Sequence, residues 1–412
     1  MNVLKGMRVI EGSAFVAVPL AGMTLAQMGA EVIRFDRIEG GLDAGRWPLA
    51  PNGQSLFWDG MNKGKKSIAI DMKSPEGREL ISEIITAPGK DAGLFLTNLR
   101  VRGWMDYETL SQRRKDLIMV CLTGDRHGRP QVDYTVNPAL GIPMMTGPEG
   151  HADPVANALP AWDLIAGNMC VSAMLAAERH RLRGGGGQEV EIALKDVAAA
   201  TLGHLGMLGD VSLNTTDREK AGNALYGAYG QDFVCADGRR VMVIGLTHRQ
   251  WRGLVKTLDM ASEVASLEAH LSTSLEDEGN RWRFRHEITA LFEPWFAARR
   301  VSDFEEMFNK AGLTWSEFRS VREAVEKDAD LSTANPIFSA VTHPSTGTYL
   351  TPRHPVHFAN ARAQTARPAP RLGENTEEIL GDLVGLNSRN IATLFDKGIV
   401  SGPRLGKHRS AA

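Results

Sequence analysis

Short apolar runs alternate with amphipathic helical segments through the first half of the chain. Residues 8–11, 19–28 and 31–36 read in order as a strand, a helix and a strand, which predicts the start of a parallel sheet. Ser74 and Pro75 predict a further helix start, since proline is tolerated at the first helical position. The spacing favours an α/β fold with a doubly wound sheet. Further strands are predicted at residues 67–71, 93–97 and 117–122.

The pattern changes after about residue 222. Residues 231–244 read as a hairpin, with Asp237-Gly238 as the turn. Amphipathic helices follow, so this part is interpreted as a second, smaller α+β domain. The predicted helices are residues 250–258, 282–292, where Pro294 ends the helix, and 301–311.

One segment combines an acid with a helix, a glycine run and a strand. Asp163 precedes a helix of small residues predicted over 166–181, then glycines at 184–187 and a strand over 188–194. Unpaired N–H groups and the helix dipole favour a carboxylate anion at a helix start, and such an anion can attack an acyl group. The alternative is that Asp163 only caps the helix, which is the commoner role for an acid in this position.

Composition excludes several classes of protein. With 412 residues and a formal net charge of −2, the chain is long enough for two or three domains, but no global charge draws it to nucleic acid or an anionic membrane. The three cysteines form no CxxC pair, which argues against a zinc site and a disulfide framework. The N-terminus lacks the apolar core of a signal peptide, and no apolar run approaches the roughly 18 residues that span a bilayer. We expect a cytoplasmic protein without a metal.

The first loop follows a strand but lacks the glycines of a dinucleotide site. Phe15, Val16 and Val18 stand where glycines would let a pyrophosphate approach, which argues against NAD. Basic residues instead follow several predicted strands, where ligands bind to open α/β sheets. They can jointly hold a phosphorylated ligand, or they can be ordinary solvated cations. These residues are Arg37, Arg46, Lys63, Lys65, Lys66, Arg100 and Arg102.

Several segments, in this order, resemble the CaiB–BaiF family (family III CoA transferases) over essentially the whole chain. They are Gly6-Met-Arg-Val-Ile-Glu, Gly29-Ala-Glu-Val-Ile-Arg-Phe-Asp, Lys63-Gly-Lys-Lys-Ser-Ile-Ala-Ile-Asp, Thr97-Asn98, Asp163-Leu-Ile-Ala-Gly, Gly187-Gln-Glu-Val-Glu-Ile and Pro370-Arg-Leu-Gly-Glu-Asn-Thr. The resemblance implies an interlocked homodimer, each subunit having a Rossmann-like large domain built from both chain ends and a small α+β domain. The expected boundaries are 1–205 and 338–412 for the large domain, 226–315 for the small domain, and 206–225 and 316–337 for linkers.

The same resemblance implies roles for individual residues. It makes Asp163 the catalytic nucleophile. The segment that corresponds to the family's glycine-rich loop is the shorter Tyr226-Gly-Ala-Tyr-Gly-Gln. The resemblance implies no cofactor beyond the CoA moiety of the substrate. The residues that fall where the family contacts CoA are Phe15, Val16, Arg37, Lys65, Asn98 and Leu99, with Arg100 or Arg102 as the next phosphate contact.

A finer set of segments resembles family members that move CoA between the two carboxyl groups of one branched, unsaturated C5 diacid. It includes Val9-Ile-Glu-Gly-Ser-Ala-Phe-Val-Ala, Arg46-Trp-Pro, Val132-Asp-Tyr-Thr-Val-Asn-Pro, Leu159-Pro-Ala-Trp-Asp and Gly203-His-Leu-Gly-Met. In such a transfer Asp163 would carry the acyl group as an anhydride and then CoA as a thioester. Candidate pocket walls are Trp162, Tyr134, Tyr226 and Tyr229, and Arg46 is a candidate partner for a substrate carboxylate or for CoA.

Three alternatives remain open at this point. An intermolecular CoA transferase would use separate donor and acceptor acids, and a CoA-binding protein would lack catalysis. A 2-methylacyl-CoA racemase of this family uses a His-Asp pair where this chain has Val132-Asp133, so one of its two proton carriers is missing.

Overall fold

The computed structural model describes residues 2–403, which divide into two compact units. The first unit combines the chain up to residue 140, residues 158–214 and the chain from residue 329 onward. The second unit combines residues 141–157 and 215–328. Each unit has its own sheet and its own apolar core. A helix, α9 (Met207–Asn214), lies within a segment that the sequence analysis treats as a linker.

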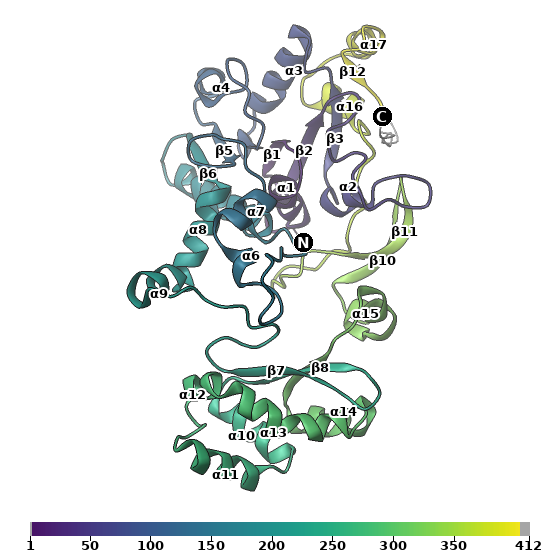
Figure 1. Ribbon diagram of the computed structural model, residues 1–412. Helices are drawn as coiled ribbons and strands as arrows, with labels where there is room; N and C mark the ends of the chain where they lie inside the picture. The colour runs from purple at the N-terminus through teal and green to yellow at the C-terminus, as the bar shows by residue number, and fades with distance from the viewer. Residues whose placement is uncertain (1, 404–412) are drawn as a thin grey trace. The chain divides into compact units, whose positions relative to one another are not determined.

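A seven-stranded sheet forms the centre of the first unit, in the order β12-β3-β2-β1-β4-β5-β6 (Figure 1). Strands β1 to β6 are parallel, and only β12 pairs antiparallel, with β3 at one edge. The predicted parallel sheet is confirmed. Strand β1 lies between β2 and β4, which makes a topological switch point where ligands bind in open α/β sheets. The strands are β1 (Arg8–Gly12), β2 (Glu31–Asp36), β3 (Lys66–Ile70), β4 (Leu94–Thr97), β5 (Ile118–Thr123), β6 (Gln188–Ala193) and β12 (Val400–Ser401).

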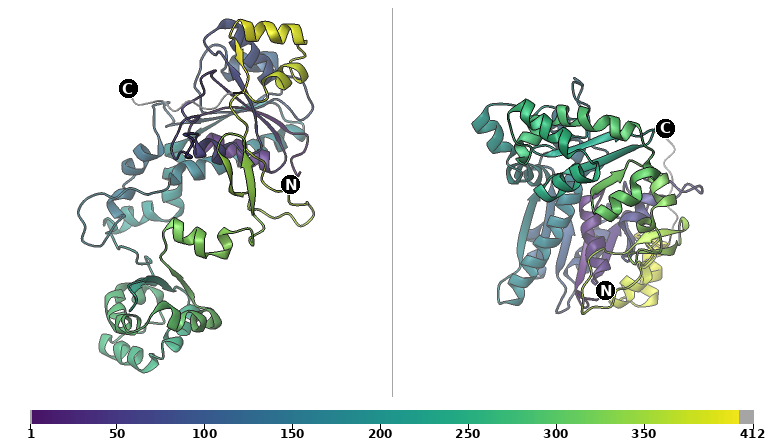
Figure 2. Two further views of the ribbon diagram at one scale, coloured as in Figure 1. Left: turned by 90° about the vertical axis from the view of Figure 1, so that its right-hand side faces the viewer. Right: turned by 90° about the horizontal axis from the view of Figure 1, so that it is seen from below.

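Helices cover both faces of this sheet. Helices α3, α4, α16 and α17 contribute to one core with the strands, through side chains such as Ile81, Leu110 and Leu380. Helix α1 packs against α7, and Figure 2 shows α1 on the opposite side of the sheet from α17. The helices are α1 (Ala17–Gln27), α2 (Leu56–Met61), α3 (Pro75–Thr86), α4 (Tyr107–Arg113), α5 (Asp133–Ala139), α7 (Ala161–Leu182), α8 (Leu194–His204), α16 (Thr376–Asp382) and α17 (Ser388–Asp396).

A hairpin ties the C-terminal part of the chain to helix α2 in the same unit. Strands β10 (Phe338–His343) and β11 (Gly347–Pro352) pair antiparallel. Between them, Thr346 donates a hydrogen bond to the buried carboxylate of Asp59 in α2. The first unit is therefore built from both chain ends by side-chain contacts as well as by the pairing of β12 with β3.

The second unit is a three-stranded antiparallel sheet with helices around an aromatic core. The predicted hairpin is confirmed, with Gly238 in the left-handed conformation (φ 77°) that its turn requires. The prediction that a helix over 282–292 ends at Pro294 is wrong, because Pro294 lies inside α13. Trp295 and Phe296, just beyond the proline, are buried in the core, and their packing offsets the lost backbone hydrogen bond. The elements are α6 (Ile142–Met145), β7 (Tyr229–Val234), β8 (Arg240–Gly245), α10 (His248–Thr257), α11 (Ala261–Leu271), α12 (Glu278–Arg283), α13 (Arg285–Ala297), α14 (Val301–Ala311), β9 (Thr314–Glu317) and α15 (Val321–Lys327).

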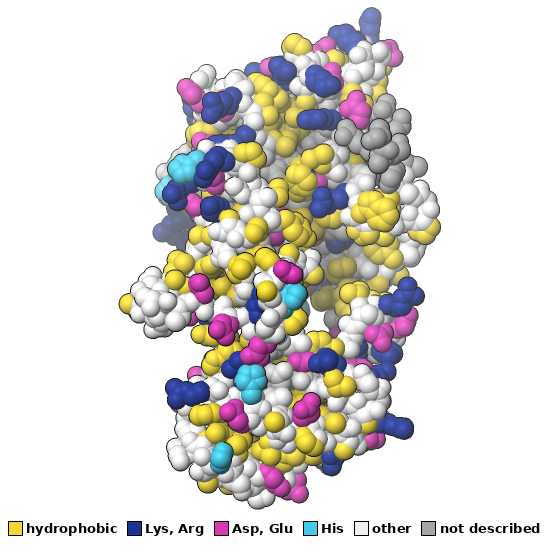
Figure 3. Space-filling view, in the orientation of Figure 1, with side chains coloured by type: hydrophobic (Ala, Val, Ile, Leu, Met, Phe, Trp, Pro, Cys, Tyr) yellow, Lys and Arg dark blue, Asp and Glu magenta, His cyan; other side chains and the backbone are white. Residues whose placement is uncertain are grey.

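The surface carries both signs of charge. On the face drawn in Figure 3, Lys and Arg side chains are interspersed with Asp and Glu, in keeping with the net charge of −2. Among the helices of residues 2–403, none is long and apolar enough to cross a bilayer. The same residues contain no group of three or more His, Cys, Asp or Glu side chains that could hold a metal ion.

Candidate active site

A cavity of about 990 Å³ opens at the carboxyl ends of the central strands of the first unit. Its walls come from the loops after β1, β2, β4 and β5 and from the first turn of α7. This is the switch point of the sheet, where a binding site is expected. The principal lining residues are 14–17, Leu42, Arg46, Trp47, Phe57, 98–100, 122–124, 128–135, Pro160 and Asp163.

Asp163 is the third residue of α7, and its side chain lines the cavity. Among residues 2–403, no side chain or N–H group donates a hydrogen bond to its carboxylate. Burial and then the neighbouring carboxylate of Asp133 together raise the pKa of Asp163 to about 6, although Arg46 opposes the rise. At neutral pH the group is therefore an anion, but a more basic one than an exposed aspartate, which suits a nucleophile.

Asp133 caps the helix that carries Asp163. The N-cap position of α7 is occupied by Pro160, which has no side-chain acceptor. Asp133 Oδ2 instead accepts hydrogen bonds from the backbone N–H of Trp162 at 2.7 Å and of Asp163 at 3.3 Å. Trp162 in turn donates from Nε1 to Asn137 Oδ1 at 3.1 Å, which fixes α5 against α7. The capping role that the sequence left open for Asp163 thus belongs to Asp133.

The loop between β1 and α1 is held by two side chains from other loops. The Asn98 amide donates to the carbonyl of Ala14 at 2.8 Å and accepts from the N–H of Ala14 at 2.9 Å. Asp43 accepts from the N–H of Phe15 at 2.8 Å. Phe15 has φ 67°, a conformation that a non-glycine residue keeps only when its surroundings impose it. Helix α1 then begins at Ala17 without a side-chain cap, which leaves its first N–H groups as donors beside the cavity.

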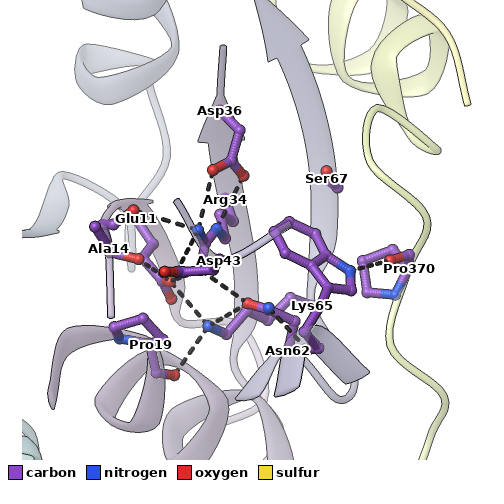
Figure 4. A network of polar contacts seen from close by, with 12 residues as sticks. Glu11, Ala14, Pro19, Arg34, Asp36, Asp43, Asn62, Lys65, Ser67 and Pro370 are labelled. Atoms are coloured by element: carbon purple, nitrogen blue, oxygen red, sulfur yellow. Dashed lines mark hydrogen bonds and ion pairs between the residues drawn. The ribbon is translucent and has the colours of Figure 1, made fainter. Parts of the chain in front are cut away.

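A buried charge network lies beneath this loop (Figure 4). Arg34 donates to both oxygens of Asp36 at 2.9 and 3.0 Å and to Asp43 at 3.0 Å, and it pairs with Glu11 at 3.6 Å. Burial alone lowers the pKa of Arg34, but the surrounding carboxylates raise it above its usual value, so the guanidinium stays charged. The network therefore connects the ends of β1 and β2 rigidly to the loop that lines the cavity.

Lys65 belongs to the same network. Its ammonium group is buried and donates to Glu11 at 2.8 Å, to the carbonyl of Pro19 at 2.9 Å and to Asn62 at 3.0 Å. Burial lowers the pKa of Lys65 to about 8, although Glu11 opposes this. The sequence predicts a CoA contact for Lys65, whereas the structure shows a residue that supports the loop from beneath. We use the term buried charge network for Glu11, Arg34, Asp36, Asp43 and Lys65.

Aromatic side chains line another part of the cavity. Trp47 and Tyr134 are 71% and 55% exposed, respectively, and Phe57 lies deeper. The Arg46 guanidinium lies 5.1 Å from the ring centre of Phe57 and 5.6 Å from that of Phe15. Arg46 thus stands over aromatic rings and close enough to Asp163 to lower its pKa, a position suited to a substrate carboxylate.

Two arginines give the cavity a basic side. Arg100 forms a loose, exposed ion pair with Glu191 at 3.7 Å. Arg129, which the sequence analysis did not select, pairs with Asp125 at 2.6 Å. Leu99 and Asn98 adjoin Arg100 on the loop after β4. Arg100 lies on the loop after β4, where a phosphate contact is expected from the sequence, and Arg129 lies on the loop after β5.

Several predicted site residues do not line this cavity. Arg37 and Arg102 are exposed on the loops after β2 and β4. Trp162 is in the first turn of α7, and its side chain is buried. Tyr226 and Tyr229 belong to the second unit, where Tyr229 is completely buried in the aromatic core.

Sequence reasoning missed Asp133, Asp43 and Arg129 as site residues. In the sequence, Asp133 stands out only beside Val132, at the position of a proton-transfer pair. A usable signal was present in Pro160, because a proline before a helix provides no side-chain acceptor for the first-turn N–H groups, so an acceptor from elsewhere is needed.

Comparisons with known proteins agree on one family. The family model for CoA-transferase family III matches residues 4–376. The chain is 53% identical over 403 residues to 2-methylfumaryl-CoA isomerase from Chloroflexus aurantiacus, covering 98% of each chain. It is 29% identical over 408 residues to succinate–glutarate CoA-transferase from Agrobacterium fabrum, covering 92% of this chain and 95% of the relative. The crystal structure of a CaiB/BaiF family protein from Brucella suis has the same fold, with a TM-score of 0.76, 24% identity and coverage of 93% and 99%.

Proposed function

The chain belongs to CoA-transferase family III, and we propose that it moves CoA between the two carboxyl groups of one substrate. The proposed reaction converts mesaconyl-C1-CoA (2-methylfumaryl-CoA) into mesaconyl-C4-CoA (3-methylfumaryl-CoA). The observation that carries this proposal is the 53% identity to 2-methylfumaryl-CoA isomerase over 98% of both chains. A carboxylate without hydrogen-bond donors, in a cavity at the switch point of the sheet, supports the chemistry.

Asp163 is the proposed nucleophile. One of its oxygens attacks C1 of the thioester, the C–S bond breaks, and a mixed anhydride and CoA thiolate form. The thiolate attacks the aspartyl carbonyl of the anhydride, which releases mesaconate into the cavity and leaves CoA on Asp163 as a thioester. The C4 carboxylate of mesaconate then attacks that thioester, and the reverse steps place CoA on C4. Covalent catalysis divides a difficult exchange into easier steps.

Each tetrahedral intermediate requires donors that are already in place. The N–H groups at Val16 and Ala17 are the proposed donors, because they line the cavity and belong to an uncapped helix start. Asn98 and Asp43 hold this turn through Ala14 and Phe15, so the donors do not have to reorganise during the reaction. Arg46 is the proposed partner of the carboxylate that is not reacting.

The remaining proposals concern CoA and the assembly. Arg100, with Asn98 and Leu99 on the same loop, is proposed to contact CoA, as are the more exposed Arg37 and Arg102. No cofactor beyond CoA is proposed. An interlocked homodimer is proposed from the family resemblance, with Tyr226 at the short loop contributing to the substrate site. The free cysteines Cys121, Cys170 and Cys235 support the cytoplasm as the location.

Incubation of the protein with mesaconyl-C1-CoA alone tests the function. Chromatography should show mesaconyl-C4-CoA without any added acid, and ¹³C-labelled external mesaconate should not enter the product, because a retained diacid has a high effective concentration. Conversion that occurs only with a second acid would contradict intramolecular transfer and would indicate an intermolecular transferase. The 29% identity to succinate–glutarate CoA-transferase makes succinate and glutarate the acids to add first.

A further inference from the structure

The geometry points to Asp133 as a positioning residue for Asp163. Its carboxylate accepts hydrogen bonds from the first-turn N–H groups of α7, so these groups do not attract the Asp163 carboxylate. Asp133 also places a second negative charge beside the nucleophile. This inference rests on the proposed role of Asp163 as the nucleophile.

The first turn of α7 needs an acceptor from outside the helix. An N-cap side chain normally accepts from the second and third residues of a helix, and in α7 these are Trp162 and Asp163. Pro160 has no such side chain, and Asp133 bonds to the same two N–H groups from α5. Asp133 therefore does from another helix what an N-cap residue does locally.

Asp163 is the acidic side chain of the first turn of α7, so without Asp133 it would be placed to accept from these N–H groups itself. An acid in the first turn is attracted to the unpaired N–H groups and to the helix dipole. A carboxylate held in that way would turn from the cavity and become less basic, since hydrogen bonds to its charged form stabilise it. Because Asp133 already satisfies both groups, the Asp163 carboxylate remains available to a substrate.

The two carboxylates also interact by charge. Asp133 is 3% exposed, and among residues 2–403 the one other charged group that shifts the pKa of Asp163 is Arg46, from the loop after β2. Burial and then the charge of Asp133 raise the pKa of Asp163 to about 6 against the opposing charge of Arg46. A like charge nearby disfavours the ionised form, so the ionised Asp163 is a stronger nucleophile above pH 6 than it would be alone.

The variant Asp133→Asn removes the negative charge of residue 133 but keeps its capping role, because the amide oxygen can still accept both hydrogen bonds. We expect the acidic limb of the kcat/KM profile for mesaconyl-C1-CoA to move down by about one pH unit, since a neighbouring charge shifts a carboxyl by about that much. The ratio of kcat/KM at pH 5 to that at pH 8 should then rise roughly fivefold. A purely structural role would lower activity or the melting temperature and leave this limb in place.

Asp106→Asn is the matched control. Asp106 caps α4, accepting from the N–H of Thr109 at 3.0 Å and of Gly103 at 2.6 Å, and does not line the cavity. The same chemical change at this helix start should leave the acidic limb where it is in the wild type. An equal movement of the limb in Asp106→Asn would overturn the assignment to Asp133.

Carbon-13 NMR titration of aspartate carboxyls, assigned with Asp163→Asn and Asp133→Asn, tests the coupling without catalysis. The Asp163 signal should titrate near pH 6 in the wild type and lower in Asp133→Asn. If Asp133→Asn does not fold, the titration of the wild-type protein tests the proposal by itself. Coupled transitions of the two carboxyl signals support it, and an ordinary, independent transition of the Asp163 signal overturns it. Coupled signals in a protein that converts no CoA thioester would refute the proposed function and leave the coupling standing.

Discussion

The buried charge network and the pair of Asp133 and Asp163 are two clusters of acids near the same cavity, and they differ in how closely their carboxylates are paired with cations. In the network, three carboxylates surround two cations, and Arg34 alone contacts three of the acids. In the pair, one carboxylate is satisfied by backbone N–H groups and the other receives no hydrogen bond from the described residues. Within the described part of the chain, the cation that lowers the pKa of Asp163 is Arg46, which is exposed.

This difference separates two requirements of catalysis. A loop that donates to developing negative charge should not move, and compensated buried charges give it a fixed geometry. The ionised carboxylate of a nucleophile must instead remain reactive, and it does so when nearby cations and donors offset its negative charge only in part. The network therefore stabilises the fold around the site, whereas the pair keeps Asp163 reactive and lowers the stability of the fold.

Replacing the nucleophile should have the largest effect. Asp163→Asn keeps the size of the side chain but removes the attacking anion, so kcat for mesaconyl-C1-CoA should fall by at least about a thousandfold. Mass spectrometry of the quenched wild type should show a CoA adduct on the peptide that contains Asp163, and this adduct should be absent from the variant. A variant that retained turnover would contradict the role of Asp163.

Removing the central cation of the network should cost most in stability. Arg34→Met removes the cation that Asp36, Asp43 and Glu11 share. Glu11 keeps Lys65 and Asp43 keeps the Phe15 N–H, but the lost charge pairing is buried, so the free energy of unfolding should fall by about 3–5 kcal/mol. Arg113→Met is the control, because it removes an exposed ion pair with Glu79 and should cost at most about 1 kcal/mol. Equal losses in urea denaturation would show that the network does not carry the stability assigned to it.

For the pair of Asp133 and Asp163, removing a charged group should increase the free energy of unfolding. Since the folded-state pKa of Asp163 is raised to about 6 by burial, then by Asp133, the ionised group destabilises the fold. Asp163→Asn should therefore increase the free energy of unfolding by about 1–3 kcal/mol above pH 6, after allowance for partial exposure. The gain should shrink as pH falls from 6 toward 4, because the wild-type group becomes protonated. A constant difference across this range, measured by urea denaturation, would contradict the raised pKa.

Loosening the donor loop should have the smallest effect. Asn98→Ala removes both hydrogen bonds to Ala14 and leaves Asp43 to hold the turn, so kcat should fall roughly tenfold while the melting temperature changes little. Asn335 is the control, because its amide also bonds the backbone twice, to Asp330 and Ile337, away from the cavity. If Asn335→Ala lowered kcat equally, the effect could not be assigned to the loop.

Local patterns predicted the elements that depend on local physics. The alternation of strands and helices gave the parallel sheet, and Asp237-Gly238 gave the hairpin turn, because periodicity and turn chemistry act over a few residues. Pro294 was misread for the same reason: its local effect is to end a helix, and the burial of Trp295 and Phe296 in the core overrides it.

The sequence by itself determined the family resemblance, the sheet and the acid at the start of a helix. Only the tertiary structure decided what surrounds that acid. Asp133 lies 30 residues before Asp163 in the chain, and Asn98 lies 84 residues after Ala14. Local sequence patterns span only a few residues, so they cannot predict either hydrogen bond. Lys65 shows the converse, since a lysine after a glycine reads as an exposed cation until packing places it beneath the loop. Burial and pairing set the charge balance of both clusters, and these are properties of the folded chain.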